Sequence, residues 1–246
     1  MKRLENKVAL VTGGSRGIGA AIAKRLAAEG ADVAITYVSS PEKAQAVAKE
    51  IDATGRKSLV IAADNADPEA VTAAVNKTVA ELGRVDILVN SAGIFDARPF
   101  ETHTMEDYDR MMDINVRAVY VAIQAALPHM PNGGRIITLG SNLADLVGAP
   151  GMTLYSMSKS ALIGLTKGLA RDLGAKEITV NLVAPGPTDT DMNPANGQYA
   201  DYQRGKMAIP KYGSAENIAA MVALIASEEG RSINGATLTV DGGVNA

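Results

Sequence analysis

The sequence predicts an α/β fold in which a doubly wound parallel sheet carries helices on both faces. Short apolar segments alternate with stretches in which Ala, Val, Leu and Ile recur at helical spacing. This alternation predicts parallel strands joined by right-handed crossovers. With 246 residues, 47% hydrophobic content and no low-complexity linker, the chain can bury one large core. We therefore expect a single domain over residues 1–246 with about seven strands.

The predicted strands are apolar runs suited to burial on both faces, bounded by turn-forming residues. In chain order they cover residues 7–12, 32–37, 57–62, 85–90, 134–140, 177–183 and 236–240. The longest predicted helices lie around residues 104–128 and 153–173. Because parallel strands end at a common edge of the sheet, we expect the residues that follow them to converge there.

A glycine-rich turn joins the first predicted strand to the first helix. Gly13, Gly17 and Gly19 lack side chains where the backbone must approach a diphosphate, and Ile18 and Ile22 follow at helical spacing. The start of that helix offers unpaired N–H groups and the positive end of its dipole to an anion. The strand before and the helix after the turn predict a nucleotide site, with a simple tight loop as the alternative.

Tyr155 and Lys159 lie four residues apart on a predicted helix and therefore share one face. A phenol near its reference pKa of about 10 transfers protons poorly at neutral pH, and an adjacent cation lowers that pKa. The pair is thus a candidate proton-transfer device. Taken alone the spacing is weak evidence, because a solvated aromatic–cation pair produces the same pattern.

The motifs Thr12-Gly13-x-x-x-Gly17-x-Gly19 and Tyr155-x-x-x-Lys159 together resemble the short-chain dehydrogenase/reductase family. The resemblance covers nearly the whole chain and implies a Rossmann-type sheet. Within the family, the chain looks most like small NADPH-dependent carbonyl reductases and 3-oxoacyl-carrier-protein reductases. Further matching features follow in order, namely Asn90-Ser91-Ala92-Gly93, Asn115, Ser141, Pro185-Gly186 and Thr190.

The resemblance implies catalytic roles for four residues. Tyr155 would supply the proton when hydride reaches a carbonyl carbon, and Ser141 would donate a hydrogen bond to the same oxygen. Lys159 would lower the phenol pKa and hold the nicotinamide ribose, and Asn115 would hold a water that connects the lysine to solvent. A turn residue and an exposed helical residue are the simpler alternatives for Ser141 and Asn115. Two departures from close relatives are Ser91 in place of an asparagine and a slightly longer interval between Ser141 and Tyr155.

The end of the second predicted strand bears on the choice of cofactor. An acidic side chain there would bind the ribose 2′-hydroxyl of NAD(H) and repel a 2′-phosphate. Residues 36–40 carry no carboxylate, whereas Arg16 and Ser39 could contact a phosphate. We expect NADP(H) to be preferred over NAD(H), with a solvated Arg16 as the alternative. The expected cofactor contacts are Gly13, Ser15, Arg16, Gly17, Ile18, Gly19, Tyr37, Ser39, Asp64, Asn65, Asn90, Ala92, Gly93, Tyr155, Lys159, Pro185, Gly186, Thr188 and Thr190.

The expected reaction is a reversible NADPH-dependent reduction of ketones or aldehydes to alcohols. A long segment rich in turn formers, residues 187–212, precedes the last predicted helix, and we expect it to cover the substrate. The residues expected to line the substrate pocket are apolar and suit a hydrophobic carbonyl compound, although each could be ordinary core. They are Leu143, Leu146, Val147, Met152 and Met192.

Three other functions remain open. A 3-oxoacyl-carrier-protein reductase would need a basic surface near the entrance, but residues 126–135 carry few cations and Lys176 is a weak remnant. A non-catalytic nucleotide-binding regulatory protein could keep the cofactor site, and only the intact set of Ser141, Tyr155 and Lys159 argues against it. An extended-family epimerase or dehydratase would show a different glycine spacing and a longer chain.

Composition argues against several classes of partner. A net charge of −3 with interspersed charges argues against nucleic-acid and anionic-membrane binding. The chain has no cysteine, and its two histidines, His103 and His129, are too few and too separated for zinc, so we expect no metal. No segment approaches the roughly 20 apolar residues of a membrane span and none reads as a signal peptide, so we expect the cytoplasm. The family resemblance also implies a homotetramer, a dimer of dimers.

Overall fold

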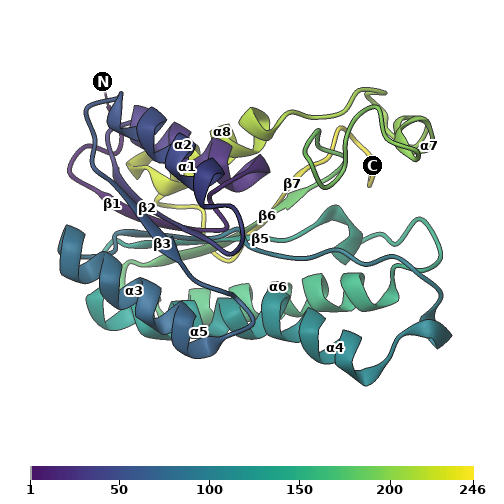
Figure 1. The fold of residues 1–246 in the computed structure, drawn as a ribbon, viewed down its shortest axis with the longest axis horizontal. Coiled ribbons are helices and arrows are strands. Elements are labelled where there is room, and N and C mark those ends of the chain that lie inside the picture. Colours follow the sequence, from purple (N-terminus) through teal and green to yellow (C-terminus); the bar gives the residue numbers. More distant parts are fainter. Residues whose placement is uncertain (1) are drawn as a thin grey trace.

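In the computed structural model, which describes residues 2–246, the chain forms a seven-stranded parallel sheet (Figure 1). The strand order is β3-β2-β1-β4-β5-β6-β7, so the direction of winding reverses between β1 and β4. The predicted fold class is confirmed, and each strand lies within about two residues of its predicted range. The strands are β1 Val8–Thr12, β2 Asp32–Tyr37, β3 Ser58–Ala62, β4 Ile87–Asn90, β5 Arg135–Leu139, β6 Thr179–Pro185 and β7 Thr237–Val240.

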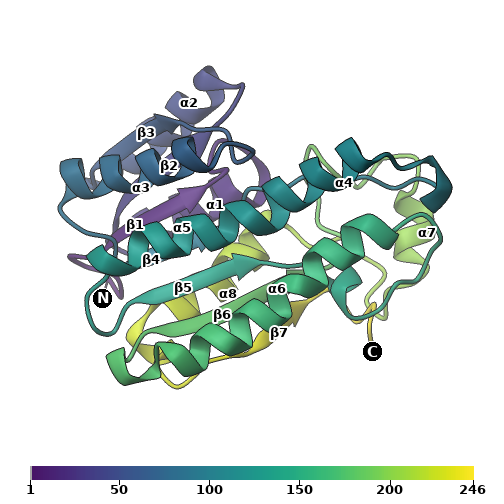
Figure 2. The same ribbon diagram turned by 90° about the horizontal axis from the view of Figure 1, so that it is seen from below.

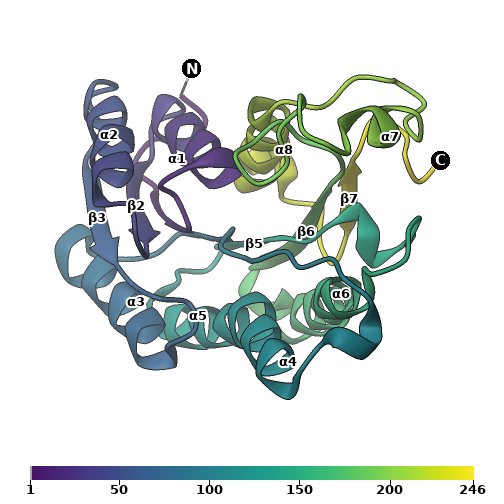
Figure 3. The same ribbon diagram turned by 45° about the vertical axis from the view of Figure 1, so that its right-hand side comes forward.

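Helices cover both faces of this sheet, as Figure 3 shows. One face carries α1 (Gly17–Ala28), α2 (Pro41–Asp52) and α8 (Ala215–Ala226), and the other carries α3 (Pro68–Leu82), α4 (Met105–Met112), α5 (Ala118–Ala126) and α6 (Thr153–Asp172). Short 3₁₀ turns lie at Phe100–Thr102, Leu127–His129, Asn142–Ala144, Gly174–Lys176 and Glu228–Gly230. Among residues 2–246, no helix is both long enough and apolar enough to cross a membrane.

Each strand contributes to two hydrophobic cores because successive side chains point to opposite faces of the sheet. In β1, Ala9 and Val11 pack into the core beneath α1 and α8 together with Ile22. Leu10, between them, packs into the core on the other face together with Leu162. This double burial is why the strands are continuous apolar runs instead of alternating ones.

The helix predicted over 104–128 is interrupted by a π-helical turn at Asp113–Arg117, between α4 and α5. Thr104 and Asp107 form a capping box that starts α4. Figure 2 shows α4 and α5 continuing as one rod past α6. Such wider turns often occur at functional sites, and this one buries Ile114 and Asn115.

The segment expected to cover the substrate, residues 187–212, is called the lid below. It lies beyond the carboxyl ends of β6 and β7 and contains the short helix α7, Ala200–Arg204, which was not predicted (Figure 1). Asn193 Nδ2 and the Tyr212 hydroxyl each donate to Gln203 Oε1, both at 2.9 Å. The lid is therefore a folded unit with its own internal bonds.

Candidate active site

The glycine-rich turn is packed too closely to accept side chains at Gly13 and Gly19. An ideal Cβ on Gly13 would lie 2.9 Å from Ala92 Cα, and one on Gly19 would lie 2.3 Å from the Gly13 carbonyl oxygen. Gly17 has a φ of +53°, in the left-handed region that favours glycine. Close packing within the protein therefore requires glycine at Gly13 and Gly19. This requirement was not predicted from the sequence.

The first turn of α1 leaves its N–H groups available to a ligand. In the part of the chain that the structure describes, α1 has no side-chain cap and no acidic residue in its first turn. The side chains of Asp67 and Thr104, by contrast, cap α3 and α4. An ideal Cβ on Gly17 would lie 3.6 Å from Thr190 Cγ2, so the lid begins beside this helix end. These features fit the phosphate groups of a dinucleotide.

Two buried threonines hold the turn in place. The Thr12 hydroxyl accepts hydrogen bonds from the backbone N–H groups of Ser91 at 3.0 Å and Ala92 at 3.2 Å. The Thr36 hydroxyl accepts one from the Gly13 N–H at 3.0 Å. Neither residue was predicted to have this role, although a polar residue at the end of an apolar strand is a usable signal.

A pair of cations lies at the mouth of the turn. Lys43 Nζ is 2.9 Å and an Arg16 guanidinium nitrogen is 4.0 Å from Asp191 Oδ2. Lys43 holds the pKa of Asp191 below its ordinary value, so this carboxylate is ionised at neutral pH. Lys43 lies in the first turn of α2, shortly after Ser39, but was not predicted to belong to the site. Two cations at this position suit recognition of a phosphate ester.

On α6, Tyr155 and Lys159 share one face beside the end of β5, as predicted. Lys159 is only 6% exposed, and its Nζ donates to the Leu139 carbonyl at 2.9 Å. The same Nζ lies 5.8 Å from the centroid of the Tyr155 ring. Ser141 lies just beyond β5, where its hydroxyl accepts a hydrogen bond from the Leu143 N–H at 3.1 Å. The structure therefore brings Ser141, Tyr155 and Lys159 together.

Burial dominates the ionisation of this pair. It lowers the pKa of Lys159 from 10.5 to about 8. It also raises the pKa of Tyr155, and the Ser141 hydroxyl acts in the opposite direction. The net shift of the Tyr155 pKa is therefore upward, opposite to the lowering expected from the sequence, because burial of the phenol is the largest influence on it.

Asn115 sits in the π-helical turn and is 1% exposed, which excludes the alternative of a surface residue. Its Oδ1 accepts from the Ile94 N–H at 2.9 Å, and its Nδ2 donates to the Ile94 carbonyl at 3.0 Å and to Ser158 Oγ at 3.1 Å. An ideal Cβ on Gly93 would lie 3.1 Å from Asn115 Oδ1 and 3.4 Å from Lys159 Nζ. Asn115 therefore ties the loop after β4 to α6. Its water-holding role stays a prediction.

Several expected cofactor residues use their side chains for hydrogen bonds within the protein. The Asn90 side chain is buried and donates to Thr138 Oγ1 at 3.4 Å. The buried Thr188 hydroxyl donates to the Gly186 carbonyl at 3.0 Å. Asp64 accepts from the Ala66 N–H at 2.9 Å, as the alternative of a plain turn requires. At these three positions the side chains serve local structure.

The expected substrate residues are at the surface. Leu146, Val147 and Met192 are each about half exposed, so they are not ordinary core. Leu143 and Met152 are half-buried.

Phe95, which the sequence analysis missed, lies in the loop after β4 and is 43% exposed. Its ring meets the Tyr155 ring edge-on, with 4.9 Å between the centroids. From the lid, the Tyr202 hydroxyl donates to the Gly148 carbonyl at 3.3 Å. Phe95 therefore packs directly on Tyr155, and the lid touches the loop that carries Leu146 and Val147.

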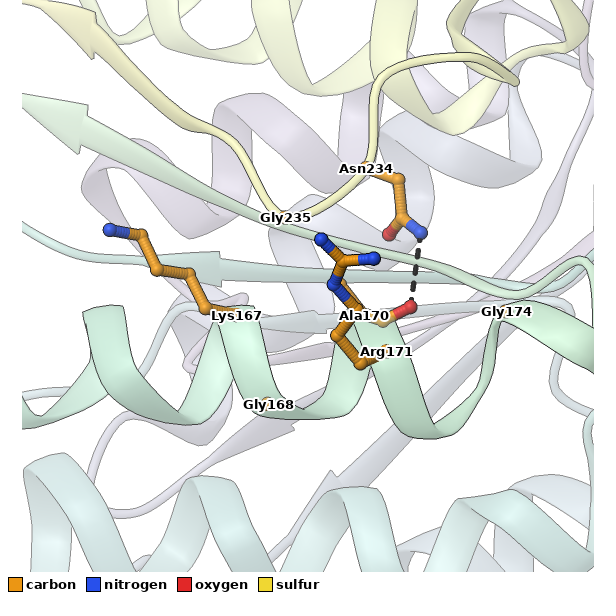
Figure 4. Close-up of a pocket in the computed structure, with 7 residues that line it drawn as sticks. All are labelled: Lys167, Gly168, Ala170, Arg171, Gly174, Asn234 and Gly235. Carbon is orange, nitrogen blue, oxygen red and sulfur yellow. Dashed lines mark hydrogen bonds between the residues drawn. The ribbon is translucent and has the colours of Figure 1, made fainter.

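A separate open cavity of about 900 Å³ lies along the C-terminal half of α6 (Figure 4). Lys167 and Arg171 border it, and Asn234 Nδ2 donates to the Ala170 carbonyl at 3.2 Å there. Because Lys167 follows Tyr155 by roughly three helical turns, this cavity is remote from the proposed chemistry. None of the predicted site residues lines it.

The chain is similar to known proteins along almost its whole length. A family model described as enoyl-(acyl carrier protein) reductase matches residues 13–245. The crystal structure of a short chain dehydrogenase from Burkholderia cenocepacia J2315 in complex with NADP is 60% identical, with a TM-score of 0.98 and coverage of 99% of this chain and 100% of that one. The cyclic-di-GMP-binding biofilm dispersal mediator protein of Escherichia coli (strain K12) is 43% identical over 100% of both chains. A 3-oxoacyl-(acyl-carrier-protein) reductase of Staphylococcus aureus (strain Mu50) is 41% identical, covering 97% of this chain and 98% of its own.

Proposed function

This chain belongs to the short-chain dehydrogenase/reductase family of oxidoreductases, and we propose that it reversibly reduces ketones and aldehydes to alcohols with NADPH. One observation carries this proposal. Ser141, Tyr155 and Lys159 meet at the end of β5, and the loop after β4 lies between them and the glycine-rich turn, since Gly93 approaches Lys159 and Ala92 packs on Gly13. The NADP complex of the similar Burkholderia cenocepacia protein supports the choice of cofactor.

The residues present fit a dinucleotide with a 2′-phosphate. Its diphosphate would rest on the open N–H groups at the start of α1, next to Gly17. Arg16 and Lys43 would bind the 2′-phosphate, and Lys159 would hold the nicotinamide ribose. When bound, NADPH supplies the hydride for the reaction.

Tyr155 is the proposed acid. Because burial raises its pKa, its phenol is protonated at neutral pH and can donate a proton to the substrate oxygen. The Ser141 hydroxyl would donate a hydrogen bond to the same oxygen as negative charge develops there. Lys159 is a cation below about pH 8 and lies close enough to favour the phenolate that forms as the proton leaves.

The proposal is tested by carbonyl-dependent oxidation of NADPH, measured over ketones, aldehydes and β-keto esters and repeated with NADH. Tyr155→Phe removes only the hydroxyl, and we expect kcat to fall by about 10²- to 10⁴-fold with an unchanged Kd for NADPH. Tyr120→Phe, at an exposed position on α5, is the matched control. Equal activity in wild type and Tyr155→Phe would refute the assigned acid.

A second candidate is a 3-oxoacyl-(acyl-carrier-protein) reductase, which the similarity to the Staphylococcus aureus enzyme favours. Lys206 and Lys211 are exposed on the lid, where an acidic carrier could contact them. The test compares kcat/KM for a 3-oxoacyl group on its carrier protein and on a small thioester. Equal values would argue for a free carbonyl substrate.

A third candidate is a nucleotide-binding regulator, because the Escherichia coli relative is described as binding cyclic di-GMP. Isothermal titration with cyclic di-GMP tests it directly. Binding without any carbonyl-dependent NADPH oxidation would favour this candidate over an enzyme.

We also propose a homotetramer, for which light scattering of the purified protein gives the mass.

A further inference from the structure

We propose that residues 241–245, which follow β7 and are called the strap below, position the Ser141 loop and the lid relative to each other. These residues would act through Ser141 and the lid, so we describe them as positioning residues. The claim about Ser141 rests on the proposed function. The claim about the lid can be tested without any catalytic activity.

At one end, the strap is bonded to the residue that follows the proposed catalytic serine. Asn142 Nδ2 donates to Asn245 Oδ1 at 3.1 Å, and Asn245 Nδ2 donates back to the Asn142 carbonyl at 2.8 Å. Asn142 is 6% exposed, so water competes poorly for these bonds. The reciprocal pair restrains the peptide immediately after Ser141, and small displacements of a positioned group reduce reaction rates strongly.

In its middle, the strap is bonded to the lid. The Gly242 carbonyl accepts from the Ile209 N–H at 2.9 Å, and the Gly243 carbonyl accepts from the Ala208 N–H at 3.4 Å. An ideal Cβ on Gly243 would lie 2.7 Å from Ala208 Cβ, so the two segments are in direct contact. Val244 packs against the small hydrophobic cluster that Ala200, Met207 and Tyr212 form within the lid.

Asp241 gives the strap its shape. Its carboxylate accepts hydrogen bonds from the N–H groups of Gly243 at 2.8 Å and Asn245 at 3.0 Å. An ideal Cβ on Gly186 would lie 2.5 Å from Asp241 Cβ, so the turn after β6 packs on the base of the strap. A single carboxylate thus holds the strap in the conformation that reaches both the lid and Asn142.

This arrangement predicts separable effects. Removing the Asn245 side chain breaks the bonds to the serine loop and leaves the backbone bonds to the lid in place. Removing the Asp241 carboxylate releases the turn and therefore loosens both ends. A purely local structural role for the strap would not produce this difference between the two variants.

The experiment compares Asn245→Ala, Asp241→Ala and the milder Asp241→Asn with wild type, using the full chain. Asn76→Ala, at an exposed position on α3, is the matched control. Three quantities are measured: kcat, the Kd for NADPH by fluorescence, and the rate at which trypsin cuts the lid at Arg204, Lys206 and Lys211. Hydrogen exchange of residues 141–146 reports on the serine loop independently of activity.

For Asn245→Ala we expect kcat to fall about tenfold, with an unchanged Kd for NADPH, unchanged cleavage of the lid and faster exchange in residues 141–146. For the Asp241 variants we expect a similar fall in kcat together with an increase of about fivefold or more in lid cleavage. The Asp241→Asn variant decides the outcome if Asp241→Ala does not fold.

Two results would overturn the proposal. If residues 141–146 exchange hydrogen at the same rate in Asn245→Ala as in the wild type, the strap does not restrain the serine loop. Wild-type cleavage of the lid in the Asp241 variants would show that the strap does not hold the lid. If the wild-type protein reduces no carbonyl compound, the proposed function fails, and exchange and cleavage still decide the role of the strap.

Discussion

The cofactor side and the substrate side of the site are built in different ways. Around the glycine-rich turn, backbone packs on backbone, with Gly13 against Ala92 and Gly19 against the Gly13 carbonyl. On the substrate side, Leu146 and Met192 are half exposed, and the contact identified between the lid and the opposite loop is one hydrogen bond from the Tyr202 hydroxyl.

This difference indicates where the protein can change without unfolding. A close-packed backbone has no space for an added atom, whereas an exposed side chain can change size at little cost in stability. We infer that the shared chemistry is fixed by the rigid side and that substrate preference is set on the exposed side. Four predictions test this comparison, beginning with the largest expected effect.

A methyl group should be tolerated on one side and not on the other. We expect Gly19→Ala to lower the free energy of unfolding by about 3 kcal/mol or more, since the new Cβ would lie 2.3 Å from a carbonyl oxygen. Gly148→Ala, where the added Cβ meets no atom within 4 Å, should change it by no more than about 0.5 kcal/mol. Urea unfolding measures both, and equal losses would remove the distinction between the two sides.

Lys159 lies where the two sides meet, so Lys159→Met should affect rate and stability in opposite directions. We expect kcat to fall about 100-fold because the cation beside the phenol is lost. Stability should rise by about 1–2 kcal/mol at pH 7, because a buried ammonium group whose pKa falls from 10.5 to about 8 opposes folding.

The sign of the pH dependence follows from the same shift. Below about pH 8 the lysine is charged in both the folded and unfolded states, so its penalty is fully present. Between about pH 8 and 10.5 the unfolded chain binds more protons, and the penalty declines as pH rises. The gain from Lys159→Met should shrink over that range, and wild-type carbonyl reduction should fall as pH passes about 8. A stability gain that is constant from pH 7 to 10 would contradict this account.

Arg16→Ala should weaken NADPH binding about tenfold and leave NADH binding nearly unchanged, because a charge-assisted bond to the 2′-phosphate is lost. Fluorescence titration with each cofactor gives the two dissociation constants. Lys77→Ala, at an exposed position on α3, controls for the general loss of a positive charge. A parallel loss for both cofactors would show that Arg16 does not read the phosphate.

Leu146→Ala should have the smallest effect and act on the carbonyl substrate alone. We expect KM for a hydrophobic ketone to rise about threefold through lost apolar contact, with the Kd for NADPH and the stability unchanged. Met105→Ala removes a comparably exposed apolar side chain on α4 and serves as the control. A loss of stability in Leu146→Ala would place this residue in the folded core.

Most of the fold could be predicted from local sequence patterns. Apolar runs and helical spacing predicted every strand because burial on both faces of a parallel sheet leaves a strong signal. The π-helical turn around Asn115 and the helix in the lid left no comparable signal, since each is only about one turn long. Lys43 and Phe95 were not predicted to belong to the site, because exposed lysines and exposed aromatic residues are common. Only their contacts in the folded protein, with Asp191 and Tyr155, indicate that they lie at the site.

By itself, the sequence determined the order of the elements, the positions of the glycine-rich turn and the Tyr155/Lys159 pair, and the edge of the sheet at which they should meet. Only the tertiary structure decided the direction of the Tyr155 and Lys159 pKa shifts, the close contacts of Gly13 and Gly19, and the bonding of Asn142 to Asn245. The physical reason is the sequence distance over which each property is determined. Periodicity records what a residue does within its own element, whereas burial and contacts between distant segments exist only once the elements have packed.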